Sequence, residues 1–424
     1  MDILDLFVER CREKGYRYYL FFGTLLGAVR EQQMMPWDDD VDVGMPRPDY
    51  DAFRKDIEER PLADNIRLFD LDHPFGKRHP FLFAKLGRTD TYIQTKERGA
   101  DLGLSIDIWP FDGLPDKAED RELYYKENDE IIQECFNSIY IPDKTDHPFK
   151  YFPALIRYQF RMLFQYKKVF RKHLAFVTRF SYDDAKFCGN PINGGPGIRK
   201  VAFPKEDLET MPALFEGKYY QIPVGFDEIL RANFGDYMMR PPKEYRMPHD
   251  YVKISWKKGC EPKVIAGDEG ENSSGMELAN AGPDAAEKLP DDWKGLVFRE
   301  DGTKKKVILY YSTFSPFLQN GKKAIDKLKS VLATFKENRD DVVLVWKNCP
   351  MFQNFLSKLE PEIWEEFEAI NHGFLEEGWG IYDGEGENSA AIALSDAYYG
   401  DSSPIIDFFL DDKRPVMIEN MEIL

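Results

Sequence analysis

Up to Pro110, hydrophobic positions follow two spacings, one typical of helices and one typical of strands. Apolar residues from Ile3 to Cys11 recur at helical spacing, which predicts a helix over Ile3–Lys14 that ends at Gly15. Short apolar runs between turn residues predict strands. The expected strands are Tyr18–Phe22, Asp40–Val43, Leu82–Leu86, Thr91–Thr95 and Ser105–Trp109, the last closed by Pro110, and the further helices are Thr24–Arg30 and Asp49–Glu59. This pattern indicates a mixed α/β domain around a small sheet.

The pattern then changes four times. Residues 119–180 look helical, residues 187–251 return to short strands and turns, and residues 259–295 are polar with little to bury. From Lys304 onward, β-rich runs alternate with helical stretches, as in βαβ units on a parallel sheet. The expected strands are Val307–Tyr311, Val342–Trp346, Ala397–Tyr399 and Val416–Ile418, and the expected helices are Lys322–Glu337, Pro361–Asn371 and Ser403–Leu410. We expect a catalytic α/β domain (1–255) with a helical insertion, a flexible acidic linker (256–303) and a smaller Rossmann-like parallel α/β domain (304–424).

Composition narrows the class of protein. A net charge of −18 over 424 residues argues against a nucleic-acid partner, which requires a basic surface. Five scattered cysteines without a CxxC pair fit a reducing compartment. The start Met1–Asp5 lacks the basic region of a signal peptide, and the longest apolar run, Tyr18–Val29, is too short to span a bilayer. We expect a cytoplasmic protein.

One segment has the opposite charge. Residues 150–180 contain eight Lys or Arg residues and no acid, interleaved with aromatic residues. The remaining residues therefore carry −26, because the whole chain carries −18. A basic aromatic helix can lie on an anionic membrane at the inner face of the cell. It can equally be a core-packing helix with a basic outer face, because long basic side chains also cover apolar surface.

The strongest chemical signal is an acidic cluster. Four carboxylates lie within the five positions Asp38–Asp42, shortly after the Gly23-Thr24 pair. In a strand, Asp38, Asp40 and Asp42 project from the same face. Carboxylates on one face suit a hard divalent cation, Mg²⁺ or Mn²⁺. The Gly-Thr pair at a strand-to-helix turn offers backbone N–H groups to a phosphate, so the sequence predicts a metal and phosphate site.

A further carboxylate on a neighbouring strand would complete that site. Asp107 lies between two isoleucines in an apolar strand, where an unpaired charge is costly unless a metal or a partner neutralises it. We expect Asp107 to bind the metal or to accept a proton. Asp112, just past Pro110, is interpreted as a turn residue. Arg30 and Lys85 are the cationic candidates for a diphosphate, whereas Trp37 and Trp109 are interpreted as packing residues.

Several motifs in order resemble the LicD family, which includes the fukutin-related transferases and belongs to the nucleotidyltransferase superfamily. They are Gly23–Arg30, Pro36–Val43, Ile106–Pro110, Phe215-Glu216-Gly217 and the stretch from Tyr237 through Pro241-Pro242 to His249. The resemblance covers residues 1 to about 255 and implies a nucleotidyltransferase-like fold. It also implies transfer of a phosphoryl-linked group, such as phosphocholine, from a CDP-activated donor to a sugar hydroxyl of a cell-surface glycan or teichoic-type polymer, with release of CMP.

With this chemistry, Asp38, Asp40, Asp42 and Asp107 are the expected metal ligands, and Asp40, Asp42 and Asp107 the catalytic residues. Gly23, Thr24, Arg30 and Lys85 are expected to hold the donor's phosphates. Two alternatives stay open: a nucleotidyltransferase that joins an NTP to a phosphorylated small molecule, and a non-catalytic polymer-binding scaffold. Clustered acids argue against the scaffold, which has no need to bear their repulsion.

The second unit resembles, less specifically, the nucleotide-binding half of a GT-B transferase of the CDP-glycerol glycerophosphotransferase type. The stretches that carry the resemblance are Ser312-Thr313, Trp346–Pro350 and Ala397–Ser403. An expected histidine is missing from Lys347–Pro350, and no partner half-domain is visible. We therefore expect a non-catalytic unit, with Ser402 and Ser403 near a helix start where phosphate could bind.

Overall fold

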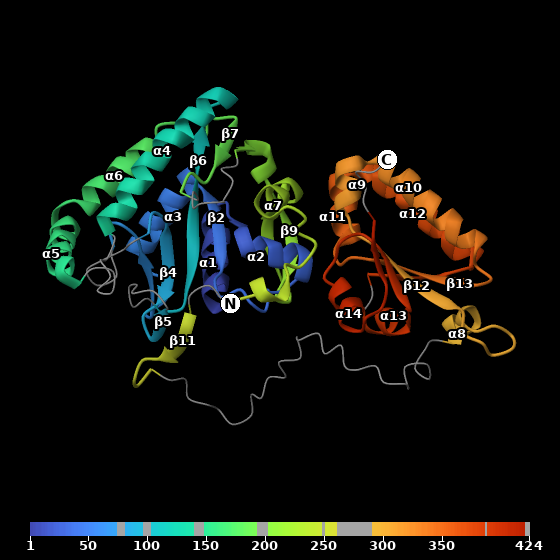
Figure 1. Cartoon of the computed structure of the whole chain (residues 1–424). Helices are drawn as coiled ribbons and strands as arrows, with labels where there is room; N and C mark the ends of the chain where they lie inside the picture. The colour runs from blue at the N-terminus through green and yellow to red at the C-terminus, as the bar shows by residue number, and fades with distance from the viewer. Residues whose placement is uncertain are drawn as a thin grey trace. The chain divides into compact units, whose positions relative to one another are not determined.

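A computed structural model describes residues 1–73, 81–95, 103–139, 148–192, 202–247, 251–260, 291–385 and 388–419 (Figure 1). The chain forms two compact units. The first comprises Met1–Gly235 and Pro242–Lys263, and the second comprises Asp236–Pro241 and Val264–Leu424. Both are α/β structures, which confirms the predicted fold class. His249, part of one family-like motif, lies outside the described residues.

The first unit is built on a mixed sheet. In the described residues its strand order is β1 (Tyr19–Leu20), β2 (Asp42–Pro46), β6 (Ser105–Leu114), β4 (Ala84–Arg88) and β3 (Ile66–Phe69). Strands β2 and β6 are parallel, and the other pairs along this path are antiparallel. Strand β6 also pairs with β7 (Phe187–Gly189), which pairs with β8 (Phe203–Pro204). The long strand β6 is therefore the centre of the unit (Figure 1).

The helices near the sheet begin and end within two residues of the predicted bounds, if the π-helical turn that follows the second helix is counted with it. Helix α1 (Asp2–Lys14) buries an apolar face that includes Phe7, and Gly15 ends it in the left-handed conformation. Helix α2 (Phe22–Leu26) continues into a π-helical turn, η1 (Gly27–Glu31). Helix α3 (Arg47–Glu59) begins with a proline in its first turn and packs on β2, β3 and β6.

The predicted helical insertion lies between β6 and β7. It consists of α4 (Ala118–Ile139), α5 (Pro148–Phe164) and α6 (Tyr166–Val177), which pack against one another. Their shared core contains Ile131, Cys135, Tyr158, Met162, Tyr166 and Phe170. Among the described helices, none combines the length and the apolar composition needed to cross a bilayer.

The rest of the first unit is made of short elements. A hairpin joins β9 (Thr210–Phe215) to β10 (Lys218–Pro223), between η2 (Lys205–Leu208) and α7 (Phe226–Phe234). The turn η3 (Lys243–Tyr245) precedes β11 (Tyr251–Trp256), which pairs with β5 (Thr91–Thr95) in a separate two-stranded sheet.

Two predictions about β6 are wrong. The strand does not end at Pro110 but continues to Leu114, because it changes partner there. Strand β4 pairs with β6 only as far as Ile108, and β7 pairs with it from Asp112, so the proline lies in the gap between them. Asp112 is therefore a buried strand residue and not a turn residue.

The second unit is a five-stranded parallel sheet, as the alternating pattern predicts. Its order is β14 (Ile381–Gly384), β13 (Val342–Asn348), β12 (Lys306–Ser312), β15 (Ala397–Gly400) and β16 (Val416–Ile418). Its helices are α9 (Ser315–Asn320), α10 (Lys322–Glu337), α11 (Phe352–Leu359), α12 (Pro361–Glu377), α13 (Asn388–Leu394) and α14 (Ile406–Asp411). Strand β14 has no counterpart among the predicted strands. Helix α8 (Asp291–Val297) falls inside the segment expected to be a linker, and its Val297 is buried.

Candidate metal and phosphate site

The sheet brings the predicted acids together. Asp42 on β2 is the register partner of Asp107 on β6, and Lys85 on β4 pairs with Asp107 from the other side. Carboxylate oxygens of Asp40, Asp42 and Asp107 all lie within 4.8 Å of one another. Those of Asp38, Asp39 and Asp40 form a second such group, so Asp40 belongs to both. We call the group of Asp40, Asp42 and Asp107 the acidic centre.

Hydrogen bonds fix the position of Asp42. Its backbone N–H donates to Thr24 Oγ1 at 2.8 Å, and its carbonyl accepts from the Phe21 N–H at 3.0 Å. The indole Nε1–H of Trp109 donates to Asp42 Oδ1 at 2.7 Å. Thr24 and Trp109 therefore orient a carboxylate of the acidic centre. For Trp109, packing is only part of the role, and the ring also stacks on Phe83 with centroids 3.7 Å apart.

Lys85 is the observed counter-charge of Asp107. Its Nζ lies 2.5 Å from Oδ1 and 2.6 Å from Oδ2, and the lysine side chain is only 11% exposed. The ammonium also lies 4.6 Å from the ring centre of Phe81 and 5.3 Å from that of Phe83. A charge-assisted contact this short holds both side chains in place. A role for Lys85 at a diphosphate stays a prediction.

The electrostatics of the acidic centre favour a cation. Burial raises the pKa of Asp42 well above its usual value, and the negative charges of Asp40 and Asp107 raise it further. Burial also raises the pKa of Asp107, although the ammonium of Lys85 opposes this shift. A divalent cation among the three carboxylates would relieve their repulsion, and carboxylate oxygens are the ligands that Mg²⁺ prefers. The residues present therefore fit the predicted metal.

The Gly23-Thr24 turn lies directly against the acids. A Cβ atom at Gly23 would stand 2.5 Å from Oδ2 of Asp38, so only glycine fits without a shift of that carboxylate. The preceding residue, Phe22, has a φ of 45°, which is rare for a bulky side chain. This strained backbone brings the start of α2 to the acidic loop. Phosphate binding by the turn stays a prediction.

Arg30, in the π-helical turn η1, is held against the loop that leads to the acids. It is 4% exposed, and it donates from Nε to Glu31 Oε1 at 2.9 Å and from Nη2 to Met35 Sδ at 3.0 Å. Its guanidinium also lies 6.0 Å from the ring centre of Trp37. These contacts give Arg30 a structural role in the loop, and its predicted contact with a diphosphate stays untested.

Comparison with known proteins agrees with the motif resemblance. A family model described as "LicD/FKTN/FKRP, nucleotidyltransferase domain" matches residues 15–163. This stretch is similar to the nucleotidyltransferase domain of the LicD family. It contains Gly23, Thr24 and all the acids of the acidic centre. We refer to the first unit as the LicD unit.

Named relatives of the LicD unit are transferases. The lipopolysaccharide cholinephosphotransferase LicD of Haemophilus influenzae is 28% identical over 254 residues, which are 59% of this chain and 92% of the relative. The ribitol 5-phosphate transferases FKRP of Homo sapiens and Mus musculus are 32% identical over 98 residues, only 17% of their length. These matches support phosphoryl-group transfer, and the protein is a phosphotransferase.

Sequence reasoning did not find the role of Glu216. This residue and Gly217 form the two-residue turn of the β9–β10 hairpin, with φ values of 50° and 73°. Its Oε1 accepts a hydrogen bond from the Met34 N–H at 2.8 Å, and its own N–H donates to the Gln32 carbonyl at 2.9 Å. The hairpin thus fixes the loop that leads into Pro36–Asp40. The family-like Phe215-Glu216-Gly217 motif was the available signal.

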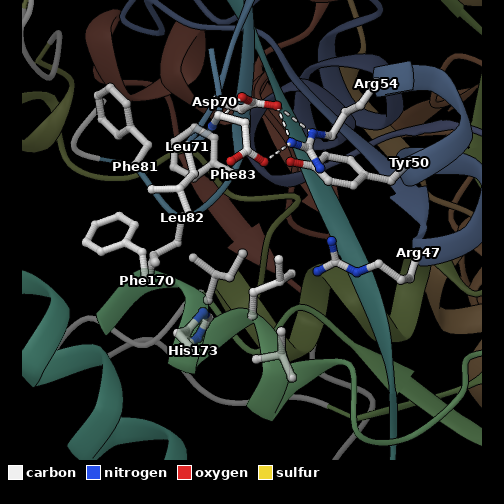
Figure 2. Close-up of a pocket in the computed structure, with 14 residues that line it drawn as sticks. Arg47, Tyr50, Arg54, Asp70, Leu71, Phe81, Leu82, Phe83, Phe170 and His173 are labelled. Atoms are coloured by element: carbon white, nitrogen blue, oxygen red, sulfur yellow. Dashed lines mark hydrogen bonds and ion pairs between the residues drawn. The ribbon is translucent and has the colours of Figure 1, made fainter. Parts of the chain in front are cut away.

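The first unit also contains a cavity (Figure 2). Its lining comes from α3, the residues after β3, the residues before β4, and α6, and it includes Arg47, Tyr50, Arg54, Asp70, Phe81, Phe83, Phe170 and His173. Two lining residues, Phe81 and Phe83, also contact Lys85. Phe81 and Phe83 are therefore shared between the cavity wall and the surroundings of Lys85.

The cationic side chains of this cavity are paired. Arg47 donates to both oxygens of Asp112 at 2.6 and 2.8 Å, and Arg54 forms an ion pair with Asp70. By contrast, the buried Nε2 of His173 has no hydrogen-bond partner in the described residues. Burial and the nearby charge of Arg47 lower the pKa of His173 to about 4, so the ring is neutral at physiological pH. A neutral imidazole can pair with a polar group of a ligand.

The second unit does not place its serines as predicted. Helix α14 begins at Ile406 instead of Ser403, because Ser403 precedes a proline and that position disfavours helical backbone. Ser403 is 2% exposed, and its hydroxyl pairs with the Tyr398 hydroxyl at 2.9 Å. At the same end of the sheet, Asp401 accepts hydrogen bonds from Thr313 N–H at 2.6 Å and Thr313 Oγ1 at 3.1 Å. The resemblance to a GT-B half stays a prediction.

Proposed function

We propose that the LicD unit transfers a phosphoryl-linked group, such as phosphocholine, from a CDP-activated donor to a sugar hydroxyl of a cell-surface glycan or teichoic-type polymer. The observation that carries the proposal is the acidic centre, in which carboxylates of Asp42 on β2, Asp107 on β6 and Asp40 in the loop before β2 lie within 4.8 Å of one another. The Haemophilus influenzae relative is a cholinephosphotransferase, which supports phosphocholine as the transferred group. FKRP is a ribitol 5-phosphate transferase, which supports the transfer of other alcohol phosphates within the family.

Asp40, Asp42 and Asp107 would hold one divalent cation, Mg²⁺ or Mn²⁺, with Asp38 close enough to Asp40 to assist. When bound, the cation neutralises charge on the donor's diphosphate and stabilises the leaving phosphate oxygen. Trp109 and Thr24 keep Asp42 oriented for this role through the hydrogen bonds described above. Lys85 keeps Asp107 in place and adds positive charge beside it.

The reaction then needs a base and a displacement. The acceptor hydroxyl oxygen attacks the phosphorus distal to cytidine, the bond from that phosphorus to the bridging oxygen breaks, and CMP leaves. Asp107 takes the hydroxyl proton at a carboxylate oxygen.

The cavity is our candidate for the organic part of the transferred group. It adjoins Lys85 through Phe81 and Phe83, and it offers aromatic walls together with the unpaired nitrogen of His173. Replacement of His173 by leucine should change the KM for the donor more than kcat. The size of the change in KM should differ from one CDP-alcohol to another. An equal effect on every donor would place the organic group elsewhere.

The proposal includes a place of action. We propose a cytoplasmic enzyme that works at the inner face of the membrane, with the basic segment 150–180 as the contact. The segment contains basic residues and no acid, and the anionic surface of the cytoplasmic leaflet attracts basic segments.

The deciding experiment incubates the purified full chain with Mg²⁺ and a panel of CDP-alcohols, and follows CMP by chromatography. We expect CMP release from one donor and none from an Asp42→Asn variant. Release of pyrophosphate from an NTP with a phosphorylated alcohol would instead favour a nucleotidyltransferase. Polymer binding without turnover of any donor would favour the scaffold.

A further inference from the structure

Helix α5 is apolar on two separate faces. One face holds Leu155, Tyr158 and Met162, which pack into the shared core of the helical insertion. A second face holds large apolar side chains that remain exposed: Phe152 (72%), Ile156 (69%), Phe160 (53%), Leu163 (72%) and Phe164 (67%). A surface helix ordinarily has one apolar face, directed at the core. We call these five exposed residues the α5 stripe.

The α5 stripe is continuous along the helix. Phe152, Ile156 and Leu163 lie within about 40° of one another around the axis, and Phe160 and Phe164 extend the same side. Figure 1 shows α5 at one end of the helical layer formed with α4 and α6. Contiguous exposed apolar patches of this kind mark interaction surfaces more often than isolated apolar residues do.

Basic residues border the α5 stripe on one side. Arg157 and Arg161 project between the stripe and the buried face, and the next helix begins with Tyr166-Lys167-Lys168. The segment from 150 to 180 has no acid, although the chain as a whole carries −18. An apolar face with a basic border is the arrangement that binds the interface of an anionic bilayer.

We propose that the α5 stripe docks on an anionic lipid bilayer, with α5 parallel to the membrane plane and its apolar side chains among the headgroups and upper acyl chains. This inference rests on the membrane contact proposed above for residues 150–180 and names the side chains that make it. It does not depend on the transfer reaction, because none of the five side chains belongs to the acidic centre or the cavity. A second copy of the chain fits the stripe less well, since pairing two stripes would bring two basic borders together.

The test uses vesicle co-sedimentation of the full chain, with phosphatidylcholine vesicles containing or lacking about a third phosphatidylglycerol. We expect binding to the anionic vesicles, weakened by salt, and at least roughly tenfold weaker partitioning for Phe152→Ser/Ile156→Ser/Leu163→Ser. Leu375→Ser, which changes an exposed leucine (55%) on α12, is the matched control and should bind like the wild type. Arg157→Gln should weaken binding to anionic vesicles and leave the weak binding to neutral ones unchanged.

All substituted positions are exposed, so the thermal midpoint should not change and unfolding does not confuse the result. Release of CMP with a soluble acceptor should also be unchanged, which separates a failure of this proposal from a failure of the proposed reaction. The proposal is overturned if the wild type does not bind anionic vesicles, or if the triple variant binds them as strongly as the wild type does. It is also overturned if the wild type is a dimer in solution that does not bind vesicles and the triple variant is a monomer.

Discussion

Each unit has an aspartate at the end of a parallel strand pair, but the surroundings of the two carboxylates differ. In the second unit, Asp401 receives the backbone N–H and the hydroxyl of Thr313. In the LicD unit, Asp42 also has a donor, the indole of Trp109, yet it lies within 4.8 Å of the carboxylates of Asp40 and Asp107. Burial raises the pKa of both aspartates. At Asp42 the charges of Asp40 and Asp107 raise it further, whereas at Asp401 the charge of Glu419 adds to the rise and the hydrogen bonds from Thr313 oppose it.

This difference separates a binding arrangement from a structural one. A carboxylate that accepts two hydrogen bonds from its own fold needs no ligand. Three neighbouring carboxylates repel one another, and a bound cation would offset this repulsion. Under the proposed function the acidic centre marks the reactive unit, whereas Ser403 and Thr313 at the end of the second sheet are held by contacts within their own unit.

The largest effect is expected for Asp42→Asn. Asparagine keeps an acceptor for Trp109 but removes one charge, so transfer should fall by roughly 10³-fold or more. The thermal midpoint of the metal-free protein should not fall, because repulsion is relieved. Asp401→Asn is the matched change in the second unit and should leave the transfer rate within about twofold of wild type. Equal loss of activity in both variants would remove the distinction between the units.

Lys85→Met should have the next largest effect, and it should act on stability. The substitution leaves Asp107 buried without its ammonium partner, which costs about 3–5 kcal/mol of the free energy of unfolding for a buried pair. The double variant Lys85→Met/Asp107→Asn should recover most of this loss but no activity. Urea denaturation measures the stability of the single and the double variant, and CMP release measures their activity. A single variant as stable as the wild type would show that Lys85 is not the counter-charge.

A smaller effect is expected from pH on Asp401. Burial raises its pKa from 3.8 to about 7, so the folded protein binds a proton that the unfolded chain releases between these values. The favourable contribution is complete below pH 3.8 and is lost as the pH rises through about 7. Asp401→Asn should therefore flatten the dependence of stability on pH between 4 and 7 by a few kcal/mol at most. An unchanged pH profile would contradict this assignment.

The smallest effect is expected for Glu216→Ala. Loss of the hydrogen bond to Met34 N–H should loosen the loop before the acids and lower kcat about tenfold, while the free energy of unfolding changes by about 1 kcal/mol. Glu216→Gln retains an acceptor oxygen and should recover most of the rate. If alanine and glutamine behave alike, the hairpin does not position the loop.

Local signals in the sequence were enough for most of the fold. Helix α1 and the parallel sheet of the second unit follow from spacing and alternation, and the acidic centre follows from the motif around Asp40 and from Asp107 between isoleucines. Strand β6 could not be delimited, because its continuation through Pro110 depends on an exchange of partner strands. Such an exchange is visible only in the tertiary structure.

Long-range contacts account for the rest of what was missed. Asp112 looks like a turn residue beside a proline, but its burial is set by Arg47, which is distant in sequence. Glu216 supports the acid-bearing loop from 182 positions further along the chain. Ser403 does not begin the helix because a proline follows it, and this signal is visible in the sequence. The cavity combines α3 and α6, which no sequence pattern connects.

The central claim is that Asp40, Asp42 and Asp107 hold a divalent cation, and the most direct test is calorimetric titration of Mn²⁺ into the full chain at neutral pH. The account predicts a saturable heat for the wild type and for Asp401→Asn, and its loss in Asp42→Asn. The same heat in Asp42→Asn as in the wild type, or no heat in the wild type even with a CDP-alcohol present, would contradict it.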